Sequence, residues 1–125
     1  MIKLFSIGIG GFCGAILRYS VGGIVHRLFH QTAFPYGTLV VNLIGCFFIG
    51  FGAGLIESRQ MFTPEMRAFI FIGIIGSFTT FSTFGLETFN LARSGQGLAS
   101  LTNLCISVFA GLLAISLGNS LSKIV

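Results

Sequence analysis

Residues 66–92 read MRAFIFIGIIGSFTTFSTFGLETFNLA, an apolar run whose middle carries five hydroxyl side chains between Gly76 and Gly85. A membrane-spanning helix needs about 20 apolar residues, so this run of about 27 is longer than one span requires. Clustered serines and threonines weaken a helix that faces lipid, and they can bond backbone groups that a break sets free. We therefore predict a broken transmembrane helix, with the break at Gly76 to Thr79. The alternative is an unbroken helix whose hydroxyls bond the carbonyls four residues earlier.

The rest of the chain also has the composition of a membrane protein. Only 8% of its 125 residues are charged, 54% are hydrophobic, and the mean hydropathy is +0.96. Soluble domains carry about a quarter charged residues. We expect an all-α membrane protein, with residues 1–125 forming a single four-helix transmembrane domain. The expected spans are residues 4–25, 36–56, 66–92 and 98–121.

The positive charges are spread almost evenly over the two sides of the membrane. Four spans place both termini on one side, which then holds Lys3, Arg59, Arg67 and Lys123. The opposite side holds Arg18, Arg27 and Arg93. An excess of Lys and Arg normally fixes orientation, and four against three is almost no excess. We therefore expect the chain to insert both ways and to form an antiparallel, dual-topology homodimer.

Glycines with GxxxG spacing occur in the first two spans, at Gly10 and Gly14 and at Gly50 and Gly54. This spacing lets helix backbones approach closely. It predicts close packing of helices, and the 18 glycines of the chain indicate more helix contacts than one chain supplies.

Polar side chains recur at helical spacing inside these apolar runs. Thr38 and Asn42 are four residues apart, and Thr80, Thr83 and Glu87 fall on one face, beside a face with Phe81 and Phe84. A further strip holds Asn103, Ser107 and Gly111. Intramembrane ionisable groups usually face an interior or a water-filled path.

For three polar or charged residues, the sequence pattern is also consistent with a purely structural role. Asn42 could pair two helices through a hydrogen bond instead of meeting a ligand. Glu87 could be an interfacial residue paired with Arg93. Arg18 is a fixed positive charge within reach of one membrane face, and its side chain could simply extend to lipid headgroups.

These groups together suit a small anion. They offer an amide, several hydroxyls and the electropositive edges of phenyl rings, with little negative charge. A cation pathway would more naturally carry rings of carboxylates or carbonyl oxygens. The chain shows no catalytic constellation, so we expect no enzyme, and its scattered basic residues indicate no nucleic-acid partner. His26 and His30 could share a metal but lack neighbouring ligands, which favours two interfacial histidines.

The sequence resembles the Fluc/CrcB family of fluoride ion channels over its whole length. The matching motifs are Gly10-Gly11-x-x-Gly14-Ala15-x-x-Arg18-Tyr19, Gly37-Thr38-Leu39-x-Val41-Asn42-x-x-Gly45 and Gly76-x-x-Thr79-Thr80-Phe81-Ser82-Thr83-Phe84-x-x-Glu87. The resemblance implies passive export of fluoride through two narrow pores in an antiparallel dimer of the plasma membrane, the inner membrane if the source is a bacterium.

The resemblance also implies roles for individual residues. Asn42 would be the polar pore residue, and Phe81 and Phe84 would be the aromatic rings along the ion path. Backbone carbonyls of Gly76 and Thr79 would hold a structural sodium ion. Arg18 would attract anions at a vestibule. Near the polar track would lie Thr38, Ser82, Thr83, Glu87 and Ser107. Some relatives place a tyrosine in the fourth helix, where Asn103 stands here.

A different class of membrane protein is the main alternative. Small proton-coupled multidrug exporters also have four helices and often insert both ways. They need an acidic residue in the first helix to bind cations, whereas the first helix here carries Arg18 and no acid.

Overall fold

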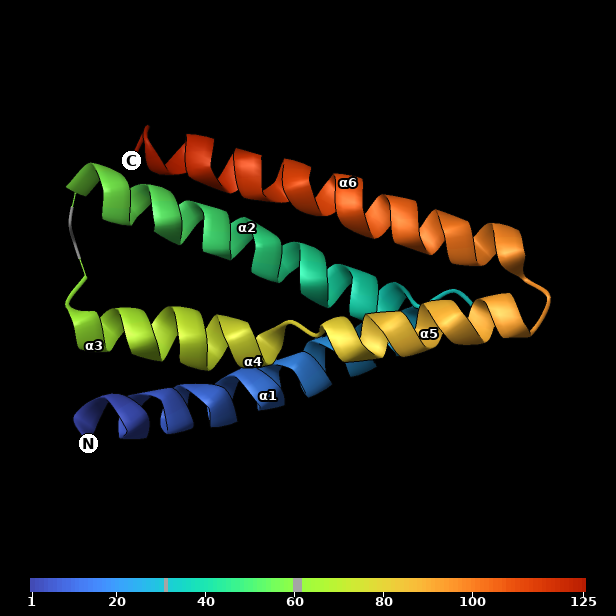
Figure 1. The fold of residues 1–125 in the computed structure, drawn as a ribbon, viewed down its shortest axis with the longest axis horizontal. Coiled ribbons are helices and arrows are strands. Elements are labelled where there is room, and N and C mark those ends of the chain that lie inside the picture. The colour runs from blue at the N-terminus through green and yellow to red at the C-terminus, as the bar shows by residue number, and fades with distance from the viewer. Residues whose placement is uncertain (31, 60–61) are drawn as a thin grey trace.

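The structure is a computed structural model that describes residues 1–30, 32–59 and 62–125. The described residues form helices and no strand. The elements are α1 (Ile2–Leu28), α2 (Tyr36–Arg59), α3 (Pro64–Arg67), η1 (Ala68–Ile75), α4 (Gly76–Phe78), α5 (Phe81–Arg93) and α6 (Gly97–Ser122). Figure 1 shows α3, η1, α4 and α5 following one another along one interrupted rod.

The prediction of four spans is confirmed. Among the described residues, four helices are long and apolar enough to cross a membrane: Ile2–Leu28, Tyr36–Ser58, Pro64–Arg93 and Gly97–Ser122. Each extends slightly beyond the range expected from the sequence, because the flanking polar residues continue the helix. The two termini lie at the same end of the bundle (Figure 1), as an even number of spans requires.

Glycines allow two pairs of helices to pack closely. A β-carbon on Gly14 of α1 would clash with the carbonyl oxygen of Ile74 in η1. In the same way, a β-carbon on Gly50 of α2 would clash with the Ile115 carbonyl of α6. Backbones this close allow van der Waals contact without large side chains, which is how helices pack in lipid. The predicted role of these glycines in helix packing is confirmed.

The connection between α5 and α6 is a tight turn. Gly95 follows the helix end with a φ of 81°, in the left-handed region that glycine adopts without a steric penalty. This is a common way to end a helix, and it brings α6 back against α5.

The third membrane-spanning segment is broken, and the break, at Thr79 and Thr80, lies nearer the C-terminus than predicted. Gly76 is still helical, with φ −63° and ψ −32°, whereas Thr79 and Thr80 are extended. The glycine is tolerated inside the helix, so the break falls instead where Thr80 can cap α5: its hydroxyl accepts from the Thr83 N–H at 3.3 Å. The sequence also gave no sign that Ala68–Ile75 would be π-helical.

Candidate functional site

The break in the third rod is held by a side chain of α2. The N–H of Thr80 donates to Asn42 Oδ1 at 2.9 Å, and Asn42 Nδ2 donates to the Thr80 carbonyl at 3.1 Å. A carboxamide matches an exposed peptide group in both directions, so it replaces the helical bonds that Thr80 gives up. Asn42 therefore does pair two helices, and the amide still has a second N–H.

Asn42 lies beside a cavity of about 360 Å³, which we name the phenylalanine cavity. Its lining includes Asn42, Cys46, Gly76, Thr79, Thr80, Phe81, Phe84 and Ser107. The rings of Phe81 and Phe84 have centroids 5.7 Å apart and are tilted by 48°. Seven of the residues singled out from the sequence thus line one space, although they come from α2, α4, the break, α5 and α6.

Two side chains that line the phenylalanine cavity leave surface or a hydrogen-bonding group free for a ligand or a second protein chain. Phe81 is 83% exposed, although it lies in the middle of a membrane-spanning rod. Ser107 Oγ is buried and has no hydrogen-bond partner among the described residues. A buried hydroxyl without a partner is costly, so a ligand that accepts a hydrogen bond would be favoured there.

A second cavity, of about 480 Å³, opens on the other side of Thr80, and we name it the Arg18 cavity. Its polar lining includes Arg18, His26, Thr38, Thr80, Thr83 and Glu87. The prediction that Thr80, Thr83 and Glu87 share a face is therefore confirmed. Because Thr80 lines both cavities, it marks the place where they adjoin.

Glu87 is bound to Thr38 and not to Arg93. The Thr38 hydroxyl donates to Glu87 Oε1 at 2.9 Å, while Oε2 is buried without a partner among the described residues. Glu87 is therefore part of the polar wall of the Arg18 cavity. Arg18 is half-buried and lines the same space, so it is not simply directed at headgroups.

Ser82 is the one predicted pore residue that neither cavity includes in its lining. Its side chain is exposed, and its hydroxyl lies 3.4 Å from Thr80 Oγ1. Thr80 Oγ1 in turn donates to Thr83 Oγ1 at 3.0 Å. Ser82 is therefore linked to the polar track through Thr80.

The break frees the two backbone carbonyls proposed as cation ligands. The Thr80 N–H, which would bond the Gly76 carbonyl in a continuous helix, donates to Asn42. The Thr83 N–H, which would bond the Thr79 carbonyl, donates to Thr80 Oγ1. Both residues line the phenylalanine cavity. Neutral carbonyl oxygens at an unwound segment suit Na⁺.

Asn103 has a structural position that the sequence did not settle. It is 1% exposed, and its Nδ2 donates to Thr88 Oγ1 at 2.8 Å, while Ser100 Oγ donates to the Thr88 carbonyl at 2.8 Å. These bonds join α6 to α5 and keep Asn103 out of the lining of the phenylalanine cavity.

Sequence reasoning missed Cys46 as a lining residue. It lies four residues after Asn42, so the same helical spacing that linked Thr38 to Asn42 would have found it. In the described part of the chain, no group of three His, Cys, Asp or Glu side chains could hold a metal ion.

Comparison with known proteins identifies the family to which this chain belongs. The family model described as CrcB-like protein, Camphor Resistance (CrcB), matches residues 5–119. The chain belongs to the CrcB-like family. The chain is 42% identical over 125 residues to a Maridesulfovibrio salexigens protein, covering 100% of this chain and 98% of that relative. It is 43% identical over 118 residues to one from Methanosarcina acetivorans, covering 94% and 88%.

The relatives carry a functional name. The first is named fluoride-specific ion channel FluC and the second fluoride-specific ion channel FluC 1. A Sulfurovum relative with the first name is 44% identical over 120 residues, covering 96% of this chain and 93% of its own. Four spanning helices and this family membership make the CrcB-like chain a multi-pass protein of the plasma membrane.

Proposed function

We propose that the chain is a fluoride-selective channel that lets fluoride leave the cytoplasm passively and so limits its toxicity. One observation carries the proposal: Asn42, Phe81, Phe84 and Ser107 line a single cavity at the helix break, in a chain at least 42% identical to three relatives named as fluoride channels. The chain acts by conducting an ion and not by catalysis.

The chemistry of the phenylalanine cavity suits fluoride. Fluoride is small and strongly hydrated, so a pore must replace its water with close hydrogen-bond donors. The free N–H of Asn42 and the unpartnered Ser107 hydroxyl are such donors. The edges of Phe81 and Phe84 carry positive partial charge. Among the described residues, no carboxylate lines this cavity, and Glu87 lines the Arg18 cavity instead.

Purified protein in liposomes tests the proposal. Liposomes loaded with potassium fluoride and treated with a potassium ionophore should release fluoride through the protein, whereas those loaded with potassium chloride should release little. Protein-free liposomes give the background leak. Fluoride release that requires a proton gradient would favour the exporter, and the absence of protein-dependent release would overturn the proposal.

The functional unit we propose is an antiparallel homodimer. The four-to-three balance of basic residues gives no preferred orientation. Phe81 projects 83% exposed from the break, and the phenylalanine cavity is bordered by this exposed ring. A second copy in the opposite orientation would cover Phe81 and complete the wall of each cavity.

We further propose that the freed carbonyls of Gly76 and Thr79 hold a structural sodium ion between the two copies. When bound, the ion would supply a positive charge toward which these carbonyl dipoles point, and it would hold the two breaks together. The chain supplies neutral oxygens only, which suits a singly charged hard cation more than a transition metal.

Gly76→Val tests the dimer and its ion. In one chain a β-carbon on Gly76 would meet only the Phe71 carbonyl oxygen at 3.4 Å, an ordinary contact. We expect normal helix content but a several-fold loss of dimer in detergent and of fluoride release, because the branched side chain crowds the partner. Gly8→Val, where a β-carbon meets nothing within 4 Å, is the control. A fully dimeric, active Gly76→Val protein would refute this placement.

A further inference from the structure

The end of α1 brings a second basic side chain to the Arg18 cavity. His26 lies in the last turn of α1, eight residues after Arg18, and lines that cavity. It also lines a neighbouring cavity of about 400 Å³, the loop cavity, together with Thr32, Asn90, Ser94 and Glu87. Within the part of the chain that the structure describes, His26 and Glu87 are the two ionisable side chains that line both cavities. These two side chains therefore lie between the Arg18 cavity and the loop cavity.

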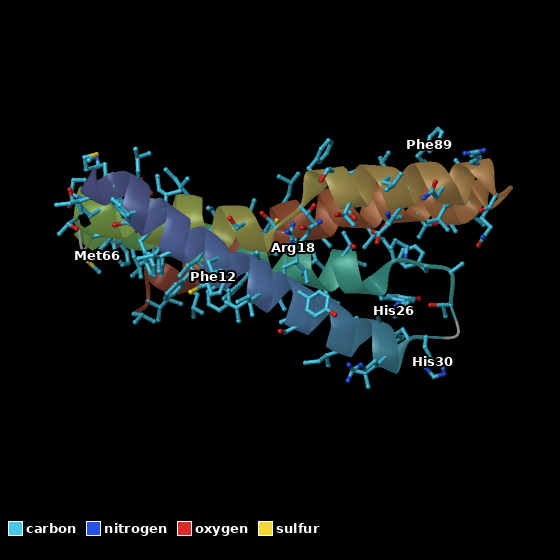
Figure 2. All side chains as sticks on the ribbon, turned by 90° about the horizontal axis from the view of Figure 1, so that it is seen from below. Phe12, Arg18, His26, His30, Met66 and Phe89 are labelled. Atoms are coloured by element: carbon cyan, nitrogen blue, oxygen red, sulfur yellow. The ribbon has the colours of Figure 1, made fainter. Side chains whose placement is uncertain are left out.

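His30 occupies a different position, although it is only four residues further along the chain. Figure 2 shows His26 between the end of α1 and the start of α2, whereas His30 points away from the helices. His30 Nδ1 lies 3.0 Å from the Arg27 carbonyl oxygen and lines neither cavity. The two histidines are therefore not placed to bind the same ligand.

We propose that His26 is a proton-controlled anion attractor at the mouth of the Arg18 cavity, so that fluoride conduction rises as the histidine becomes protonated. This inference rests on the proposed function. Histidine is the side chain that ordinarily changes charge between about pH 5 and 8.

The other charged or titratable groups that face this space belong to three elements. Arg18 and Tyr19 come from α1, Tyr36 from the start of α2 and Glu87 from α5. Arg18 keeps its positive charge at all ordinary pH values, so it supplies a constant attraction. The Glu87 carboxyl is engaged by Thr38 at 2.9 Å. His26 therefore adds an attraction that depends on pH, and replacing His26 separates its contribution from that of Glu87.

The expected effect is modest because the His26 side chain is exposed. At low ionic strength, a unit charge about 8 Å from an anion, in a medium with the dielectric constant of water, changes the local anion concentration about two- to threefold. The negative charge of Glu87 does not cancel this change, because it acts equally on the protonated and the neutral histidine.

Fluoride currents across planar bilayers test the inference, since neutral hydrogen fluoride carries no current. Both sides are held at the same pH, about 6 or about 8, so that the orientation of the protein does not matter, and at an ionic strength of about 10 mM, so that salt screens the histidine little. The parent should carry about two- to threefold more current at the lower pH. His26→Gln should carry the lower current at both values, and His26→Arg the higher current at both. His30→Gln should keep the parental ratio.

Three results would overturn the inference. A parent current that does not change with pH removes the effect itself. A parental ratio in His26→Gln assigns the effect to another group, such as Glu87. A lost ratio in His30→Gln shows that the loop as a whole is responsible. A parent that carries no fluoride current at either pH refutes the proposed channel function, which separates that failure from failure of the inference.

Discussion

Asn42→Asp is expected to reduce fluoride release from liposomes about a hundredfold or more, the largest effect of any single substitution considered. A carboxylate places negative charge where the anion must pass. At about 4 Å and an effective dielectric constant of about 20, the repulsion is on the order of 4 kcal/mol. Half of that energy already corresponds to more than a tenfold loss, because each 1.4 kcal/mol is about a factor of ten.

The structure adds a second reason for this loss. Asn42 Nδ2 donates to the Thr80 carbonyl at 3.1 Å, and aspartate would put an oxygen in the place of that donor. Two oxygens would then face each other at the break, while the bond from the Thr80 N–H to Oδ1 could persist. We therefore expect the break to shift as well as the charge to change.

Asn42→Ala separates these two contributions. Alanine removes both hydrogen bonds to Thr80 but introduces no charge. If charge dominates, the alanine variant should release fluoride faster than the aspartate variant, with both measured on dimeric protein of matched yield. An assembled Asn42→Asp protein that conducts at the parental rate would show that the amide does not lie on the ion path.

The spans could be predicted from sequence because lipid imposes a simple requirement. Residues 28–56, 68–86 and 94–122 contain no Asp, Glu, Lys or Arg, and a long charge-free run in a short chain has few alternatives to a membrane helix. The GxxxG spacing likewise predicted close helix packing correctly, because Gly14 and Gly50 lie so near a backbone carbonyl that no side chain would fit.

The position of the break could not be predicted from the sequence in this way. Its position depends on Asn42 bonding Thr80 across 38 residues of sequence, and helical periodicity reports only on neighbours within one helix. The sequence therefore identified Asn42 and the hydroxyl cluster separately but left open whether Asn42 bonds protein or ligand. The π-helical turns of Ala68–Ile75 leave no compositional signal in a uniformly apolar stretch.

Replacing both phenylalanines, Phe81→Ile with Phe84→Ile, should lower fluoride release more than tenfold while the protein still folds and dimerises. Isoleucine keeps apolar bulk but removes the electropositive ring edge. Each single replacement should give a smaller loss. Phe81 is 83% exposed in the chain, so its replacement disturbs few contacts within one copy. Phe84 is half-buried, and its ring centroid lies 5.7 Å from that of Phe81.

Phe89→Ile is the matched control, because Phe89 is on the same helix, is 61% exposed and lines neither cavity. Figure 2 shows its ring pointing outward from α5. Its release rate should equal that of the parent, which would show that losing an exposed ring from this helix does not by itself reduce release. If the Phe81 and Phe84 variants, alone and combined, also conduct at the parental rate as intact dimers, the rings only fill space. Fluoride would then depend on the Asn42 amide and the Ser107 hydroxyl alone.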